Sequence, residues 1–154
     1  PNVRPATPAD IDAIARLDAH TTGLDRAAML AWLRDGAPTT AWVCESAGHM
    51  TGVVLGRIGH DAVHIGPIIA PEVDTSAALL DAAITSHPDA RLYIDIDDAS
   101  PGWRSLVEAC GFIAQRPFTR MYRGPWRPPA PRPLPASPSV LHPLMFAIIG
   151  PEFG

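Results

Sequence analysis

Hydrophobic and polar residues follow two different periods along the chain, one typical of helices and one typical of strands. Apolar residues spaced three and four apart predict helices at residues 7–20, 25–36, 75–87 and 102–110. Short apolar or alternating runs predict strands at residues 40–46, 50–59, 62–70, 91–97, 112–123 and 144–150. Helices interleaved with a hairpin-containing sheet predict an α/β (α+β) fold with three layers.

Two local signals add detail to this pattern. Thr7 is a favourable N-cap, Pro8 suits the first helical position, and Asp10 stands three residues after the cap, so the first helix begins here. Pro67 lies inside a predicted strand but has no amide hydrogen to donate to a neighbouring strand. We therefore expect the hydrogen-bond ladder of that strand to break or splay at Pro67.

The stretch IGPIIAPEVDTSAALLDAAI, residues 65–84, combines a strand, a tight turn and the start of a helix. Proteins use this combination to hold a phosphate, because the first amides of a helix point outward. Such turns are usually rich in glycine, which lets the backbone approach the ligand. This turn contains no glycine and carries Glu72 and Asp74, whose charges repel a phosphate. The pattern alone leaves open whether a phosphate binds here.

Length and composition are those of one globular domain covering residues 1–154. The chain is 47% hydrophobic and 18% charged, which is enough apolar material for a single core. Residues 124–143 hold eight of the 18 prolines, so we expect an extended connector there. An apolar strand follows this connector, and we expect it to return and pair in the sheet.

Charge is divided unevenly along the chain. Residues 1–98 carry six arginines and 14 acids, whereas residues 99–154 carry six arginines and two acids, and the net charge is -4. This balance gives no reason to expect nucleic acid or an anionic membrane as a partner. Five arginines between Phe112 and Arg132 form either a solvated basic face or a surface that helps hold an anionic ligand.

Two further features bear on the compartment. No apolar run is long enough to span a bilayer and no signal-peptide pattern opens the chain, so we expect a cytoplasmic protein. Cys44 and Cys110 lie in apolar segments without metal-binding spacing, so we expect two buried thiols and neither a disulfide nor a metal site.

Several short stretches of this sequence resemble one known family. VRPATPADIDAIARLDA resembles the opening strand and first helix, and LVEACGF resembles a helix-to-strand junction, of the GCN5-related N-acetyltransferase (GNAT) superfamily. The likeness is closest to the C-terminal GNAT domain of tandem bacterial acetyltransferases. Short sequence motifs typical of that domain appear here in order along nearly the whole chain: GLDRAAML, AWV, VLGR, IGPIIA, YIDI, GF, RMYRG and FAIIGPEFG.

The resemblance implies a fold, a reaction and a donor site. The fold is a mixed, mostly antiparallel sheet of about six to seven strands with helices on both faces, and the reaction moves an acetyl group from acetyl-CoA to an amine. Pantetheine is expected along one strand and the pyrophosphate at the helix that follows, so the implied cofactor-binding residues are Ile68, Ile69, Ala70, Asp74, Thr75 and Ser76. The family's glycines would fall near Glu72, Asp74 and Ser76, so this chain has other residues in place of all three glycines. Asp74 either offers its amide to the pyrophosphate or caps the helix itself.

The resemblance also locates the group that protonates the departing thiolate. The usual Tyr is replaced by Val107, and the usual Asn near the start of that helix falls at Ser100, which is a further cofactor-binding candidate. Tyr122 is a candidate replacement acid, with a packing role as the alternative. Thiolate is a good leaving group, so water is another possible proton source.

Several acids and one histidine are candidates for accepting a proton from the amine or for binding it. His64 precedes IGP on the predicted central strand, and Asp95 lies in YIDID two residues before Asp97. Two neighbouring carboxylates raise the pKa of one of them, which suits a base or a site for a cationic amine. His64 and Asp95 are the catalytic candidates, and Asp97 and Glu45 are substrate-binding candidates. The alternatives are a core histidine and solvated strand ends.

Asp25 is a third substrate-binding candidate, because acceptors often enter this fold near the loop between the first two helices. The alternative is that Asp25 is a plain N-cap and that Arg26 is a surface charge.

Two hypotheses from different classes follow. The first is an acetyl-CoA-dependent N-acyltransferase acting on a small amine, with no metal and with no nucleic-acid or membrane partner, and a homodimer is possible. The second is a GNAT-fold module that does not catalyse, which the missing glycines and the missing Tyr favour. The turn at residues 72–77 discriminates between the two hypotheses. Free amides there favour donor binding and hence the acyltransferase, whereas a turn capped by its own side chain favours the non-catalytic module.

Overall fold

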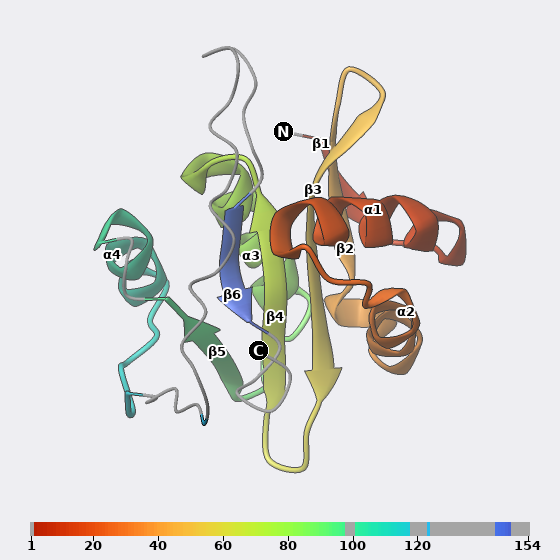
Figure 1. The fold of residues 1–154 in the computed structure, drawn as a ribbon. Helices are drawn as coiled ribbons and strands as arrows, with labels where there is room; N and C mark the ends of the chain where they lie inside the picture. Colours follow the sequence, from red (N-terminus) through yellow and green to blue (C-terminus); the bar gives the residue numbers. More distant parts are fainter. Residues whose placement is uncertain (1, 98–100, 118–122, 124–143, 149–154) are drawn as a thin grey trace.

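A six-stranded sheet runs through the middle of the molecule (Figure 1). The structure is a computed structural model, and it describes residues 2–97, 101–117, 123 and 144–148. The strands are β1 (Asn2–Pro5), β2 (Trp42–Ser46), β3 (His49–Ile58), β4 (Val63–Ala70), β5 (Leu92–Ile96) and β6 (Leu144–Ile148). The helices are α1 (Ile11–Thr22), α2 (Ala27–Gly36), α3 (Val73–Thr85) and α4 (Pro101–Ala109), with short 3-10 turns η1 (Pro8–Asp10) and η2 (Pro38–Thr40).

β1, β2, β3 and β4 follow one another across the sheet. β5 pairs with the first half of β4, and β6 pairs with the second half of β4 on one side and with β5 on the other. Only the β4–β5 pair is parallel, and every other pair among the described strands is antiparallel. The prediction of a mixed, mostly antiparallel sheet in an α/β (α+β) three-layer fold is therefore confirmed.

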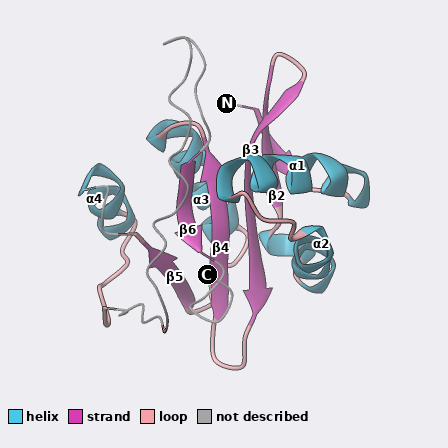
Figure 2. Cartoon of the chain, viewed as in Figure 1, coloured by secondary structure: helices cyan, strands magenta, loops and turns pink. Residues whose placement is uncertain are grey.

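Helices cover both faces of the sheet, and each face has its own core (Figure 2). α1 and α2 lie on one face and bury Ile14, Leu30 and Leu33 against β2 and β3. α3 and α4 lie on the other face, where their apolar residues pack against β4 and β6. That second core contains Leu79, Leu80, Trp103, Val107, Ile65, Ile68 and Ala147, all buried.

The start of the first helix confirms the predicted cap. Thr7 is the N-cap, and Thr7 and Asp10 form a reciprocal capping box in which the Thr7 amide donates to the Asp10 carboxylate at 2.7 Å. The first turn is a 3-10 turn, and the α-helix proper starts at Ile11. Gly23, with φ 75°, ends the helix in the left-handed conformation that favours glycine.

The predicted break at Pro67 is present as a change of partner along β4. Residues 63–65 of β4 pair with β5, whereas residues 68–70 pair with β6. The Gly66–Pro67 peptide between them is cis. Because Pro67 has no amide hydrogen, the ladder is interrupted where β5 diverges from β4.

Two sequence predictions need correction. The strand predicted at residues 112–123 is wrong for residues 112–117, which have no regular secondary structure, and most of the remainder lies outside the described residues. The apolar pattern alone does not show β1, which is only four residues long, but the resemblance of VRPATPADIDAIARLDA to an opening strand predicts it and the structure confirms it. Cys44 is buried as expected. Cys110 is exposed, because it lies just after the end of α4, and the residue of that helix that packs into the core is Val107. The connector at residues 124–143 lies outside the described residues.

No helix in the described part of the chain is both long enough and apolar enough to cross a bilayer.

Candidate functional site

The first turn of α3 follows β4 after only two residues, and it presents backbone amides without a side-chain cap. Glu72 is the N-cap residue, in an extended conformation, and no side chain bonds to the amides of this turn in the described structure. The alternative in which Asp74 caps the helix is therefore wrong. Within the described residues the amides of Val73, Asp74 and Thr75 have no acceptor, because the first amides of a helix have no carbonyl four residues earlier.

Ser76 contributes neither its amide nor its hydroxyl hydrogen to this set. Its amide donates to the carbonyl of Glu72 at 3.1 Å, and its hydroxyl donates to the carbonyl of Val73 at 2.7 Å. The side chains of Thr75 and Ser76 are buried. A Cβ placed on Gly52 of β3 would lie 3.2 Å from the Thr75 methyl carbon, so the first turn of α3 sits close on the sheet. The turn therefore presents mainly backbone donors.

Glu72 and Asp74 are both exposed beside these amides. The helix dipole and the amides favour an anion at this end of α3, whereas the two carboxylates oppose one. An exposed like-charge pair at a few ångströms costs on the order of 1 kcal/mol. The backbone of the turn is thus suited to an anion, whereas the negative side chains around it oppose anion binding.

The segment of β4 that precedes this turn has strands on both of its edges. Ile68 and Ile69 pair with Val54 and Val53 of β3 on one edge. On the other edge the partners come from β6, and Ala147, Met145 and Leu144 stand opposite Ile68, Ile69 and Ala70. Figure 1 shows β6 (blue) lying between β4 and β5. A ligand that pairs along residues 68–70 therefore meets β6.

Two of the predicted catalytic residues lie on one face of the sheet near the point where β4 and β5 diverge. The rings of His64 and Tyr93 are in edge-to-face contact with centroids 5.3 Å apart. Leu92, Ile94 and Ile96 pack toward α3 and α4, so Tyr93 and Asp95 face the opposite side, which α1 and α2 cover in part. His64, Tyr93 and Asp95 are all partly exposed.

Asp95 follows Tyr93 by two residues, a spacing of about 7 Å along a strand. The structure thus groups His64 and Asp95 around a tyrosine that the sequence analysis had not singled out. The alternation of RLYIDID could have identified Tyr93, since it puts Tyr93 and Asp95 on the same face. Asp97 lies just beyond the end of β5 and is exposed.

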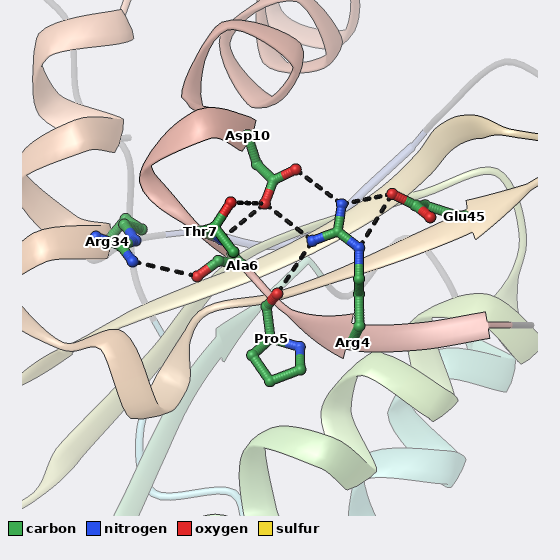
Figure 3. Close-up of polar contacts among 7 residues, drawn as sticks. All are labelled: Arg4, Pro5, Ala6, Thr7, Asp10, Arg34 and Glu45. Atoms are coloured by element: carbon green, nitrogen blue, oxygen red, sulfur yellow. Dashed lines mark hydrogen bonds and ion pairs between the residues drawn. The ribbon is translucent and has the colours of Figure 1, made fainter.

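Glu45 is engaged by an arginine at the edge of the sheet (Figure 3). Arg4 donates to Glu45 through Nε at 3.1 Å and to both oxygens of Asp10 at 2.8 and 2.9 Å. The Arg4 guanidinium holds the pKa of the Asp10 carboxyl well below its usual range, and Asp10 in turn raises the pKa of Arg4. These contacts tie β1 to β2 and to the start of α1, and substrate binding by Glu45 stays a prediction.

The loop between α1 and α2 differs from the alternative in which Asp25 is a plain N-cap and Arg26 a surface charge. Arg26, not Asp25, is the N-cap residue of α2, and Asp25 accepts a hydrogen bond from the Ala27 amide at 3.3 Å. The Arg26 guanidinium is not a surface charge, because it bonds to the fully buried carboxylate of Asp18. An open depression of about 510 Å³ is lined by residues 25–29, so Asp25 stays a substrate-binding candidate.

Other expected groups are absent or lie elsewhere. Val107 of α4, at the position where the family resemblance expects a Tyr, is buried in the core between α4 and the sheet, and its side chain offers no hydroxyl. Ser100 and Tyr122 lie outside the described residues. Among the residues that the structure describes, no three His, Cys, Asp or Glu side chains are grouped as a metal site would need.

Comparison with known families decides the assignment. The model of the acetyltransferase (GNAT) domain matches residues 14–133, which is most of the chain. The chain belongs to the GNAT acetyltransferase family. Its likeness to the C-terminal domain of tandem bacterial acetyltransferases stays a prediction.

Solved structures agree with this GNAT assignment at the level of the fold. TTHA1254 from Thermus thermophilus superposes with a TM-score of 0.56 at 18% identity, over 82% of this chain and 100% of its own. Ard1 from Thermoplasma volcanium superposes with a TM-score of 0.60 at 20% identity, over 75% of this chain and 84% of its own. No curated protein matches the sequence at a significant level.

Proposed function

We propose that this GNAT domain is a cytoplasmic, acyl-CoA-dependent N-acyltransferase that moves an acetyl group from acetyl-CoA to a small amine. The observation that carries the proposal is the uncapped first turn of α3, where the amides of Val73, Asp74 and Thr75 have no acceptor in the described part of the chain. A helix start with free amides is suited to a pyrophosphate. Family membership supports the acyl transfer itself.

The backbone of this turn suits the pyrophosphate of the donor, whereas the charged side chains of the turn oppose it. Three amides and the helix dipole attract the pyrophosphate, and Glu72 and Asp74 weaken that attraction without blocking the amides. We therefore expect a donor affinity in the micromolar range or weaker, with binding that responds to the charges at residues 72 and 74.

The acceptor side of the site is the face that carries His64, Tyr93 and Asp95. The amine nitrogen attacks the thioester carbonyl, so a C–N bond forms and the C–S bond breaks. His64 or Asp95 accepts the proton that the amine loses. The departing thiolate takes a proton from water or from a residue outside the described ones, since Val107 has none to give.

A cationic amine suits the carboxylates at the end of β5. Asp95 lies on β5 and Asp97 just beyond it, whereas the one described cation opposite His64 is Arg57, on the β3 side. An amine binds as an ammonium ion near such carboxylates and must lose a proton before it attacks. This requirement gives a base a clear role.

Turnover with a panel of amines tests the proposal. The full chain is incubated with acetyl-CoA and small primary amines, and the released thiol is measured together with the acetylated amine. We expect amine-dependent release, and His64→Gln or Asp95→Asn should lower kcat by about 100-fold or more, while the exposed Asp61→Asn should not. Release that is absent with every amine, or that is unchanged in both variants, would contradict the proposed enzyme or its base.

One observation favours the second candidate, a GNAT-fold module that does not catalyse. β6 pairs with residues 68–70 of β4, the segment along which the resemblance expects pantetheine. In a non-catalytic module this strand would be a permanent part of the sheet. Loss of donor binding in every form of the chain would favour this candidate.

A further inference from the structure

β6 completes the sheet at a place that the neighbouring strands leave open. β4 and β5 pair directly only at residues 63–65, and beyond Pro67 they no longer contact each other as strands. β6 lies between them there and pairs with Ile68 on one side and with Ile96 on the other, both through Ala147. A segment from the far end of the chain thus occupies the opening in the sheet.

This opening ends beside the first turn of α3. Ala70, the last residue of β4, stands opposite Leu144, and α3 begins three residues later at Val73. A linear ligand whose phosphates reach the amides of Val73, Asp74 and Thr75 and whose body runs back along β4 therefore needs the edge that β6 holds. The backbone groups of residues 68–70 cannot pair with both.

β6 is a short strand, and its ladder with β5 is shorter still. It is five residues long, and of its described side chains only Ala147 is buried, while Met145 and Ile148 are partly exposed. Its pairing with β5 involves only Asp95 and Ile96 among the described residues. A short strand held by so short a ladder on one edge opens at a lower free-energy cost than a strand paired along its whole length on both edges.

We infer that β6 is a built-in competitor of the acyl donor: it closes the β4 edge in the resting chain and leaves that edge when acetyl-CoA binds. This inference rests on the proposed function, since it regulates the same donor site. It predicts that holding β6 in place weakens donor binding and that releasing β6 strengthens it.

A reversible crosslink holds β6 in place in the full chain. Ile96 and Ala147 stand opposite each other in an antiparallel pair and both face the α3–α4 core, so cysteines at these positions can form a disulfide. The variant is Ile96→Cys/Ala147→Cys in a Cys110→Ser background, because Cys110 is exposed whereas Cys44 is buried. The same sample is titrated with acetyl-CoA after oxidation and again after reduction.

Ala147→Asp releases β6 instead, because it places a charge in the α3–α4 core. Its control is Thr39→Asp, at an exposed position in η2, and circular dichroism and thermal melting establish that both variants are folded. Hydrogen exchange of the β6 amides, with and without acetyl-CoA, gives a readout that does not depend on turnover.

We expect the oxidised crosslinked chain to bind acetyl-CoA at least tenfold more weakly than the same chain after reduction. Ala147→Asp should bind more tightly than Thr39→Asp, and acetyl-CoA should speed exchange in β6. Equal binding by the oxidised and reduced chains would overturn the inference and leave the proposed function standing. Absence of binding by both the reduced chain and folded Ala147→Asp would overturn the inference and the proposed function together.

Discussion

The carboxylate of Asp18, fully buried in α1, accepts hydrogen bonds from the guanidinium of Arg26 at the start of α2. Nε of Arg26 lies 3.0 Å from Oδ2, and Nη2 bonds to Oδ1. The hydroxyl of Thr22 adds a bond to the Asp18 carbonyl at 2.8 Å. This ion pair fixes how α2 leaves α1, and it therefore shapes the loop that borders the depression at residues 25–29.

Removing one partner of this pair should be strongly destabilising. Asp18→Ala leaves the Arg26 guanidinium beside a buried space without the carboxylate that balances its charge, which costs about 3–5 kcal/mol of unfolding free energy. Urea unfolding measures the change, and Asp12→Asn, at an exposed position of the same helix, should change it by less than about 0.5 kcal/mol. Equal effects of the two substitutions would show that the pair adds nothing.

Asp10 should make the fold sensitive to acid. Arg4 and Thr7 hold the pKa of Asp10 below its ordinary value, so its contribution to stability is fully present above about pH 4 and is lost as the pH falls below that value. Asp10→Asn should lower the free energy of unfolding by about 1 kcal/mol at pH 7, because the carboxylate that makes the capping contact in the natural chain is charged at that pH.

Unfolding measured at several pH values checks this expectation. The stability difference between the natural chain and Asp10→Asn should shrink as the pH falls from about 5 toward about 2. Glu108→Gln is the control, because Glu108 is exposed and pairs with Arg104 across one turn of α4. A difference that stays constant with pH would argue against a charged Asp10 in the folded state.

Local sequence patterns account for most of the secondary structure. The spacing of Ile11, Ile14 and Leu17 and the cap at Thr7 were enough for the first helix, and the apolar strands on either side of Gly48 were enough for the hairpin. Such signals act over a few residues, so they are visible without knowledge of the fold.

Long-range contacts explain what the sequence did not predict. Nothing local to Leu144–Ile148 indicates that this strand pairs between β4 and β5, since strand partners are chosen by distant residues. Arg26 looked like a surface charge because its partner Asp18 is brought to it by the packing of α1 on α2. The free amides of α3 depended on which residue became the N-cap, and the sequence suggested Asp74 as a cap whereas the structure has Glu72 there.

Gly56 of β3 should not tolerate a side chain. A Cβ there would lie 2.6 Å from the carbonyl oxygen of His64 and 2.9 Å from the Thr40 hydroxyl, so β3 or β4 must shift. Gly56→Ala should lower the free energy of unfolding by about 1–3 kcal/mol.

Gly102 of α4 is the matched control, because a Cβ there meets nothing within 4 Å in the described structure. Gly102→Ala should be neutral or stabilise by up to about 1 kcal/mol, since alanine favours a helix. Thermal melting of the two variants compares them directly, and a Gly56→Ala chain as stable as Gly102→Ala would mean that β3 and β4 are not packed as described.

Neutralising the acids of the α3 turn should strengthen donor binding. Glu72→Gln and Asp74→Asn each remove an exposed negative charge beside the amides of Val73 and Thr75, a gain of about 1 kcal/mol or about fivefold in affinity at low salt. Asp81→Asn, exposed further along α3, should have a much smaller effect. Titration of acetyl-CoA at low and high salt measures both, and an unchanged affinity in the double variant would place the pyrophosphate elsewhere.

Calorimetric titration of acetyl-CoA into the purified full chain at modest salt tests the central claim most directly. If the uncapped turn of α3 holds the donor, heat should report a single site of micromolar affinity that Glu72→Gln and Asp74→Asn strengthen. Absence of binding up to near-millimolar acetyl-CoA, in the natural chain and in folded Ala147→Asp alike, would contradict the acyltransferase and leave the non-catalytic module.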